Sequence, residues 1–205
     1  LFLLVLGGIY IGAFTPTEAS GIGAFGAAAF AFFKGHVRSW GALLDILIDS
    51  TKTSAILFSV IFGALVFANF INLSGLPYDL LDMIESMNMG PIGVVLFVCL
   101  ICIILGMVFE AVGLLLLIVP VFLPTLQILG VDMIWFGIIM VVVVEMGLIT
   151  PPIGMNVFTV RAVMPDIRLG DIFKGVMAFV FADVIALALI LMFPVIAIGL
   201  VEILR

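Results

Sequence analysis

The stretch Phe136–Arg161, FGIIMVVVVEMGLITPPIGMNVFTVR, decides how the rest of the chain is interpreted. It is apolar on both sides of two consecutive prolines, Pro151 and Pro152. Because proline has no backbone N–H, a helix running through this point would leave the carbonyls of Gly147 and Leu148 without their normal donors. An unmet carbonyl is costly in lipid, so such a break is tolerated only where protein or a water-filled cavity surrounds it. The stretch therefore predicts a membrane helix that is interrupted at mid-span.

The polar groups at the predicted break suit ions of both signs. Freed carbonyls, the hydroxyl of Thr150 and the amide of Asn156 would form a cluster of hard oxygens, which suits a small cation. The helix that follows points its N-terminus at the same place, which suits an anion. A proline kink that only shapes packing is the alternative. The complete pattern Thr-Pro-Pro-x-Gly-x-Asn favours a binding site.

Composition places the chain in a membrane. Of its 205 residues, 66% are hydrophobic and 10% are charged, and the mean hydropathy is +1.53. Soluble domains are about 45–50% apolar and about 25% charged. The apolar runs exceed the roughly 20 residues that cross a bilayer, and they lack the alternation of a membrane barrel. We therefore expect an all-α integral membrane protein, a multi-span helical bundle.

Residues 91–129 consist of two apolar arms around GMVFEAVG, Gly106–Gly113. Each arm could cross the bilayer by itself. Glu110 at the turn, with Pro120 and Pro124 in the second arm, favours a re-entrant hairpin instead. The spacing alone leaves both possibilities open.

The remaining segments are assigned from their local patterns. Thr15 or Thr17 could cap the helix that follows, where Glu18 favours a helix N-terminus. Asp183 in the last apolar run is a candidate for function or for a helix-end role. Four segments are expected: scaffold-type helices over residues 1–90, with an amphipathic surface helix over 40–53 and a separate span from 54 to 72; a re-entrant hairpin over 91–129; a discontinuous transport helix over 130–165; and a surface segment with the final span over 166–205.

The distribution of basic residues orients these segments. Residues 73–90 contain no Lys or Arg and are expected outside. By the positive-inside rule the basic loops are cytoplasmic. Six of the seven basic residues lie in two loops, Lys34, Arg38 and Lys52 in one and Arg161, Arg168 and Lys174 in the other.

A hairpin tip and a broken helix, both polar at mid-membrane, make half of a known transporter design. Secondary transporters commonly use two inverted repeats with discontinuous helices, and they bind substrate and coupling ions between them. Only one such set is visible here. The chain opens on Leu1 inside an apolar run, so we expect a piece of something longer, with the partner half missing or supplied by another copy.

Three motifs resemble the large membrane subunit, of the DctM type, of TRAP transporters. They are GGIYIGAFTPTEA (Gly7–Ala19), GMVFEAVGLLLLIVPVFLP (Gly106–Pro124) and FGIIMVVVVEMGLITPPIGMNVF (Phe136–Phe158). The resemblance covers essentially the whole chain, in order, and corresponds to the C-terminal half of that subunit. One departure is Val143, where the family often has Asn.

The resemblance implies an elevator-type, sodium-driven importer of small organic anions, such as C4-dicarboxylates and sialic or other sugar acids. Such a carrier is a multi-pass protein of the bacterial inner membrane. It takes its substrate from a periplasmic binding protein and works with a small membrane subunit. It is not an enzyme, and we expect no nucleic-acid partner.

The resemblance also implies where the ions bind, at the hairpin tip and at the break that faces it. Glu145, expected to be a second buried acid, is interpreted as structural, as balancing the cation's charge or as pairing with the absent half. Sodium is expected, mostly through backbone oxygens, at Gly106, Glu110, Gly113, Gly147, Thr150 and Pro151. Substrate is expected at Thr150, Pro152, Gly154 and Asn156.

Three other classes of protein are alternatives for this sequence. An intramembrane enzyme would use Glu110, Glu145 or Asp183 as acid or base, but no span carries a His–Ser, HExxH or paired-aspartate signature. A membrane scaffold or assembly subunit that moves nothing fits the small-residue helix faces, but it does not need the Thr-Pro-Pro break. A channel is a third option, for which flux would be downhill and unsaturable.

Overall fold

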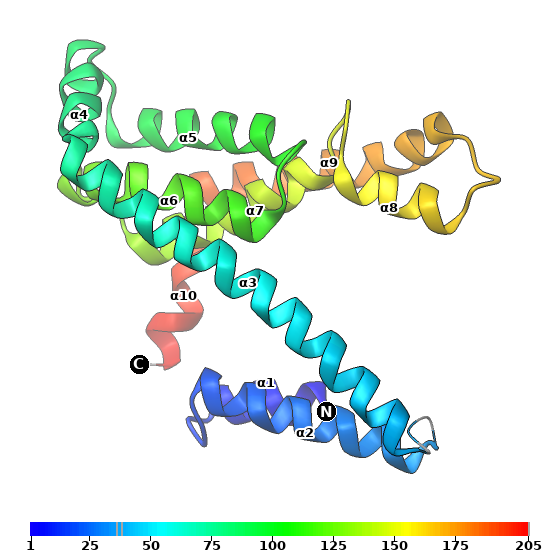
Figure 1. The fold of residues 1–205 in the computed structure, drawn as a ribbon. Helices are drawn as coiled ribbons and strands as arrows, with labels where there is room; N and C mark the ends of the chain where they lie inside the picture. Colours follow the sequence, from blue (N-terminus) through cyan, green and yellow to red (C-terminus); the bar gives the residue numbers. More distant parts are fainter. Residues whose placement is uncertain (36, 38, 205) are drawn as a thin grey trace. The chain divides into compact units, whose positions relative to one another are not determined.

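The computed structural model describes residues 1–35, 37 and 39–204, which form ten α-helices and no strand (Figure 1). Arg38, used above for orientation, lies outside the described residues. Within the described part, three helices are long and apolar enough to cross a membrane: α3 (Trp40–Ser74), α6 (Ala111–Ile128) and α9 (Leu169–Met192). The all-α membrane fold class is therefore confirmed. The chain divides into two compact units, residues 1–59 and residues 60–203, and each is described by itself.

The first unit begins with α1 (Phe2–Tyr10) and α2 (Pro16–Phe33), which pack on each other. The cap of α2 is Thr15 rather than Thr17. The Thr15 hydroxyl accepts the backbone N–H of Glu18 at 3.3 Å, and the Glu18 carboxylate accepts the backbone N–H of Thr15 at 2.8 Å. This reciprocal pair is a capping box, and it satisfies two backbone donors at the start of the helix.

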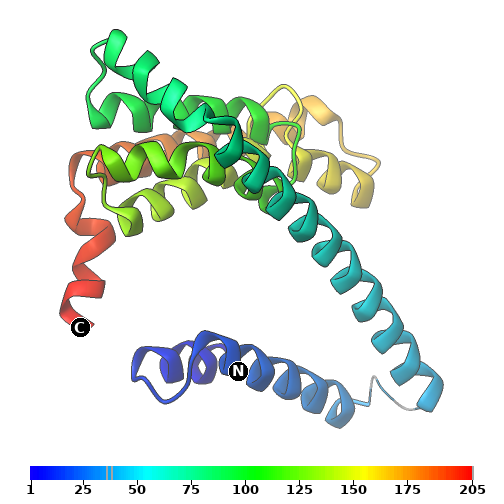
Figure 2. The same ribbon diagram turned by 60° about the vertical axis from the view of Figure 1, so that its left-hand side comes forward.

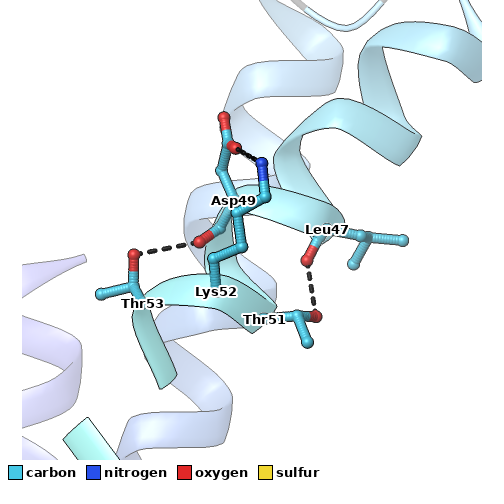
Figure 3. Close-up of polar contacts among 5 residues, drawn as sticks. All are labelled: Leu47, Asp49, Thr51, Lys52 and Thr53. Atoms are coloured by element: carbon cyan, nitrogen blue, oxygen red, sulfur yellow. Dashed lines mark hydrogen bonds and ion pairs between the residues drawn. The ribbon is translucent and has the colours of Figure 1, made fainter. Parts of the chain in front are cut away.

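Residues 40–53 are the first part of the single 35-residue helix α3, which continues without a break through the predicted span at 54–72. Residues 44–63 are exposed along its whole circumference. Its polar side chains bond within the helix: the hydroxyls of Thr51 and Thr53 donate to the carbonyls of Leu47 and Asp49 at 2.7 and 3.0 Å (Figure 3). Lys52 pairs with Asp49 at 3.4 Å. These polar side chains therefore bond to their own helix.

The second unit is built around α7 (Met133–Ile149), which packs most extensively on α5 (Pro91–Gly106) and also contacts α6 and α9. Figures 1 and 2 show α5, α6 and α7 lying side by side. Asp132 caps α7 by accepting the backbone N–H of Trp135 at 2.8 Å. Fully buried side chains of the core include Val94, Val98, Cys102, Leu114, Leu126, Ile139, Met140 and Val143.

Among the side chains that the structure describes, one polar group is buried in this core. Thr125 of α6 has no exposed surface, and its hydroxyl donates to the carbonyl of Pro77 at 3.1 Å. Pro77 belongs to α4 (Leu76–Ser86), so the bond fastens α4 to α6. A buried hydroxyl needs such a partner, because an unmet one would carry the full desolvation penalty.

The last apolar run, taken as one span from the sequence, is two helices in the structure. α9 ends at Met192 and α10 (Val195–Leu204) follows after Pro194. The physical reason is the missing N–H of Pro194, which cannot continue the hydrogen-bond ladder of α9.

Candidate functional site

The helix interruption predicted at Pro151 and Pro152 is confirmed. α7 ends at Ile149, and α8 (Met155–Val163) begins after a short non-helical segment. Gly154 has φ of 58°, in the left-handed region that glycine adopts without a steric penalty. A Cβ on Gly154 would lie 3.2 Å from the carbonyl oxygen of Thr150. The break is therefore a tight backbone turn between two separate helices.

Thr150 closes the end of α7 with two of its own groups. Its backbone N–H donates to the Gly147 carbonyl at 3.1 Å, and its hydroxyl donates to the Met146 carbonyl at 2.5 Å. The Gly147 carbonyl lacks its normal donor, as predicted, but the Thr150 N–H replaces that donor, so this carbonyl is not free. The backbone N–H of Thr150 bonds to the carbonyl of Gly147, three residues earlier. Its hydroxyl bonds to the carbonyl of Met146, four residues earlier, which would be the partner of that N–H in a regular helix.

The Leu148 carbonyl is the one that the prolines leave open. Its normal donor would be the N–H of residue 152, which is proline, and no group in the described residues replaces it. The carbonyl oxygens of Leu148 and Thr150 both lie within 3.3 Å of the position that a Cβ on Gly154 would occupy. The Thr150 hydroxyl, which acts as a donor here, keeps lone pairs that can accept. The turn thus gathers hard oxygen donors of the kind that small cations prefer.

The other side of the break presents donors. Gly154 caps α8 without a side-chain hydrogen bond, whereas the N–H of Val157 bonds to the Gly154 carbonyl at 2.9 Å. The N–H groups of Met155 and Asn156 find no acceptor among the residues that the structure describes. Free N–H groups and the positive end of the helix macrodipole together favour an anion at this point.

The hairpin between α5 and α6 meets the break at two glycines. A Cβ on Gly147 would lie 2.9 Å from the Cα of Gly106, and a Cβ on Gly106 would lie 3.2 Å from the Cα of Gly147. Both residues are buried. The backbones of α5 and α7 therefore touch three residues before Thr150. The end of α5 thus lies against the last turn of α7.

Glu110 and Gly113 serve the hairpin itself. The Glu110 carboxylate caps α6 by accepting the N–H groups of Val112 and Gly113 at 3.1 and 3.0 Å. Gly113 lines a groove of about 250 Å³, which it shares with Leu117 and with residues 60–67 of α3. The sequence reasoning placed Glu110 at a cation site but did not foresee this capping role. The pattern of an acid directly before an apolar helix could have indicated it.

The remaining acids and the amide lie as follows. Glu145 was expected to be buried, but it is exposed, because Val143, Val144 and Gly147 turn toward the core and Glu145 lies on the opposite face of α7. Asn156 is exposed in the first turn of α8, beside the open N–H groups. Asp183 is half-buried in α9.

The Met146 carbonyl is a site group that the sequence reasoning missed. A threonine in or just after a helix commonly bonds the carbonyl four residues earlier, and the spacing from Met146 to Thr150 carries that signal. In the described residues no three His, Cys, Asp or Glu side chains gather as a metal-binding group. The break itself offers backbone and hydroxyl oxygens.

Comparison with known proteins finds one family over nearly the whole chain. Residues 1–196 match the family described as "Tripartite ATP-independent periplasmic transporter, DctM component". The chain is 33% identical over 200 residues to the C4-dicarboxylate TRAP transporter large permease protein DctM of Pseudomonas aeruginosa. That alignment covers 98% of this chain and 47% of the relative.

Two further relatives carry different substrate names. The chain is 31% identical to the sialic acid TRAP transporter large permease protein SiaM of Vibrio cholerae, over 94% of the chain and 45% of the relative. It is 32% identical to the isethionate TRAP transporter permease protein DctMQ of Oleidesulfovibrio alaskensis, over 78% of the chain and 25% of the relative. The chain thus spans about half the length, or less, of these curated relatives.

Proposed function

Because the chain belongs to the DctM component family of tripartite ATP-independent periplasmic (TRAP) transporters, we propose that it forms the C-terminal half of the large membrane subunit of a sodium-coupled importer of small organic anions. One observation carries the proposal: a single backbone turn offers open oxygens on one side and open N–H groups on the other, with a hairpin packed against it. A carrier that couples a cation to an anion needs both kinds of group within reach of each other.

The oxygens of the break fit a sodium ion. The carbonyls of Leu148 and Thr150 converge beside Gly154, and the Thr150 hydroxyl adds a third donor. Hard oxygen ligands of this type suit alkali and alkaline-earth cations rather than soft metals. Two further backbone groups complete the proposed set. Pro151 follows Thr150 in the chain, and Gly106 at the end of α5 packs against Gly147. A further carbonyl, that of Gly147, retains a lone pair beyond its bond to Thr150.

The start of α8 fits the carboxylate of the substrate. The N–H groups of Met155 and Asn156 are open, and the Asn156 amide is exposed beside them. Pro152 and Gly154 set the direction in which this helix begins. A bound cation would attract the carboxylate, so occupancy of the oxygen side raises the affinity of the N–H side, and the reverse holds by linkage.

The hairpin is proposed to be re-entrant and to move with the interrupted helix as an elevator. α5 has 16 residues, which gives it a length of about 24 Å against a hydrocarbon core of about 30 Å. A helix too short to span, joined to a tip that packs on the break, supports a hairpin that turns back inside the bilayer. The backbone contact between Gly106 and Gly147 would hold hairpin and break together during the motion.

The rest of the assembly is proposed from the family. A periplasmic binding protein delivers the substrate, and a small membrane subunit accompanies the large one in the bacterial inner membrane. One relative, the isethionate TRAP transporter permease protein, is named DctMQ, which supports an association of the large subunit with a second membrane component. The other half of the large subunit supplies the second part of the site. Glu145, exposed on an otherwise apolar helix, is proposed to pair with a donor on that half.

The test is sodium-dependent uptake by the complete transporter with its binding protein in proteoliposomes. Thr150→Ala and Asn156→Ala should raise the sodium or substrate concentration for half-maximal uptake by roughly tenfold, since each removes one polar contact. Thr159→Ala is the matched control, because that hydroxyl only bonds back to the Met155 carbonyl at 3.1 Å within α8. An unchanged sodium dependence in both site variants would defeat the proposal and leave the scaffold alternative.

A further inference from the structure

The break between α9 and α10 raises the same chemical problem as the break after α7. The Ile190 carbonyl lies four residues before Pro194, so the helical donor it would normally receive does not exist. Phe193 donates its own N–H to the Leu189 carbonyl at 2.8 Å, so the Ile190 carbonyl receives no backbone donor from this turn. An unmet carbonyl in an apolar setting carries a large penalty, so a substitute donor has particular value here.

That donor comes from another helix. The indole Nε1–H of Trp135 donates to the Ile190 carbonyl at 2.9 Å. Trp135 stands in the first turn of α7, and its backbone N–H is bonded to the Asp132 carboxylate at 2.8 Å. Its side chain is only 7% exposed. The residue is therefore held at both ends, by the cap of its own helix and by a carbonyl 55 positions away.

The surroundings of Trp135 include both sides of the proline. Leu187 of α9 and Ala197 of α10 are buried in the same hydrophobic cluster as Trp135, and Ile190 and Ile198 pack against that cluster. The ring thus lies where the two helices diverge. Its hydrogen bond is made to the carbonyl at the corner, within a cluster to which both helices contribute.

We propose that Trp135 is a positioning residue that replaces the N–H missing at Pro194, and so fixes the α9–α10 corner to the start of α7. The corner and α7 then move as one body. At Pro194 the carbonyl left without its helical donor is bonded by a side chain, whereas at Pro152 it stays open for a ligand. The assignment of Trp135 rests on the hydrogen bond and the packing; only its effect on uptake rests on the proposed function.

A double-mutant cycle tests the assignment in the complete transporter. Trp135→Phe keeps an aromatic ring but removes the donor, so the equilibrium constant for opening the corner should rise roughly fivefold to tenfold. Pro194→Ala returns a backbone N–H to position 194, so Trp135→Phe should have a much smaller effect in that background. The probe is the maleimide labelling rate of a cysteine introduced by Ala197→Cys, which is buried at the corner, in a background with Cys99→Ala and Cys102→Ala.

Trp40→Phe is the matched control, because Trp40 is 73% exposed and the same substitution there should leave the labelling rate unchanged. If Trp135→Phe accelerates labelling equally with the native Pro194 and in the Pro194→Ala background, the ring acts through packing alone and the proposal is wrong. If Trp135→Phe does not yield folded protein, Trp135→Phe with Pro194→Ala should fold, and its failure to do so overturns the assignment equally.

The effect on uptake separates this inference from the proposed function. Trp135→Phe should lower the maximal uptake rate and leave the sodium concentration for half-maximal uptake unchanged, since Trp135 does not touch the break at Pro152. Coupling between positions 135 and 194 in the labelling assay would stand even if Thr150→Ala left the sodium dependence intact. A shift in the sodium dependence caused by Trp135→Phe would contradict the distinction between the bonded and the open carbonyl.

Discussion

The sequence Gly-x-x-Thr-Pro occurs twice in this chain, at Gly12–Pro16 and at Gly147–Pro151, and the two threonines behave in opposite ways. Thr15 bonds to a later residue: its hydroxyl accepts the N–H of Glu18 and caps the start of α2. Thr150 bonds to an earlier residue: its hydroxyl donates to the Met146 carbonyl at the end of α7.

The residue after the first proline accounts for the difference. Pro16 stands at the first position of α2, where a missing N–H is harmless, and Thr17 continues the helix at once. Pro151 is followed by a second proline, which disfavours helical backbone in the residue before it, so the next helix begins only after Gly154. One proline thus begins a helix, and two leave a stretch of backbone with open groups. The comparison predicts that substitutions at the break of Pro151 and Pro152 change ion and substrate binding. Substitutions at the start of α2, beside Pro16, should change only the stability of the fold.

The largest effect is expected from Gly147→Ala. The added methyl carbon would lie 2.9 Å from the Cα of Gly106, so one of the two helices must shift. Overpacking of this kind costs roughly 1–3 kcal/mol, and we expect uptake to be lost. Gly137→Ala on the same helix is the control, because nothing lies within 4 Å of its added carbon and uptake should persist. Normal uptake by Gly147→Ala would show that the hairpin and the break need not touch.

Gly154→Ala should come next. Its φ of 58° is strained for alanine, and the methyl group would enter the space between the carbonyl oxygens of Leu148 and Thr150. We expect the sodium requirement to rise by about tenfold or more, since a left-handed alanine costs roughly 1–2 kcal/mol and the oxygens are also displaced. Gly130→Ala, with φ of 72° and open space around it, reproduces the strain without the oxygens. Equal effects at both glycines would argue against a site at Gly154.

Pro152→Ala sharpens the comparison further. It supplies the N–H that the Leu148 carbonyl lacks, so the oxygen should turn into the helix and become less available. We expect a several-fold weaker response to sodium together with higher thermal stability, since one hydrogen bond contributes about 1 kcal/mol. Pro151→Ala should change the sodium response less, because the Gly147 carbonyl already accepts from Thr150. A larger change at Pro151 than at Pro152 would reverse the assignment of the open carbonyl.

The smallest effect is expected at the start of α2, beside Pro16. The backbone N–H and hydroxyl of Thr15 lower the pKa of Glu18 below its usual value of 4.5. A lowered pKa in the folded state stabilises the fold above the unfolded pKa, and this contribution is lost as the pH falls through the folded value. Glu18→Gln should therefore reduce thermal stability slightly near neutral pH and make no difference in strong acid. Its sodium-dependent uptake should match that of the native protein, and a changed sodium response would link the start of α2 to binding.

Several elements follow from local chemistry and could be predicted. The interruption at Pro151 and Pro152 and the cap at Asp132 both depend on residues within a few positions of each other. The alternatives left open, such as Thr15 or Thr17, concern which of two suitable side chains adopts the capping rotamer. The pattern over residues 40–53 indicated a separate surface helix, but nothing between 53 and 54 breaks the backbone ladder, so α3 continues.

The amino-acid sequence by itself determined the membrane class and the family, because apolar content and motifs are covalent properties of the chain. The tertiary structure decided that helices end before Pro151 and Pro194, whereas α6 continues through Pro120 and Pro124. Only the tertiary structure decided which carbonyl stays open, that Gly106 touches Gly147, and that Glu145 faces outward. It alone decided that Trp135 serves the carbonyl at Ile190. These outcomes depend on how distant helices pack and on which donor reaches a carbonyl first, and no local pattern contains that information.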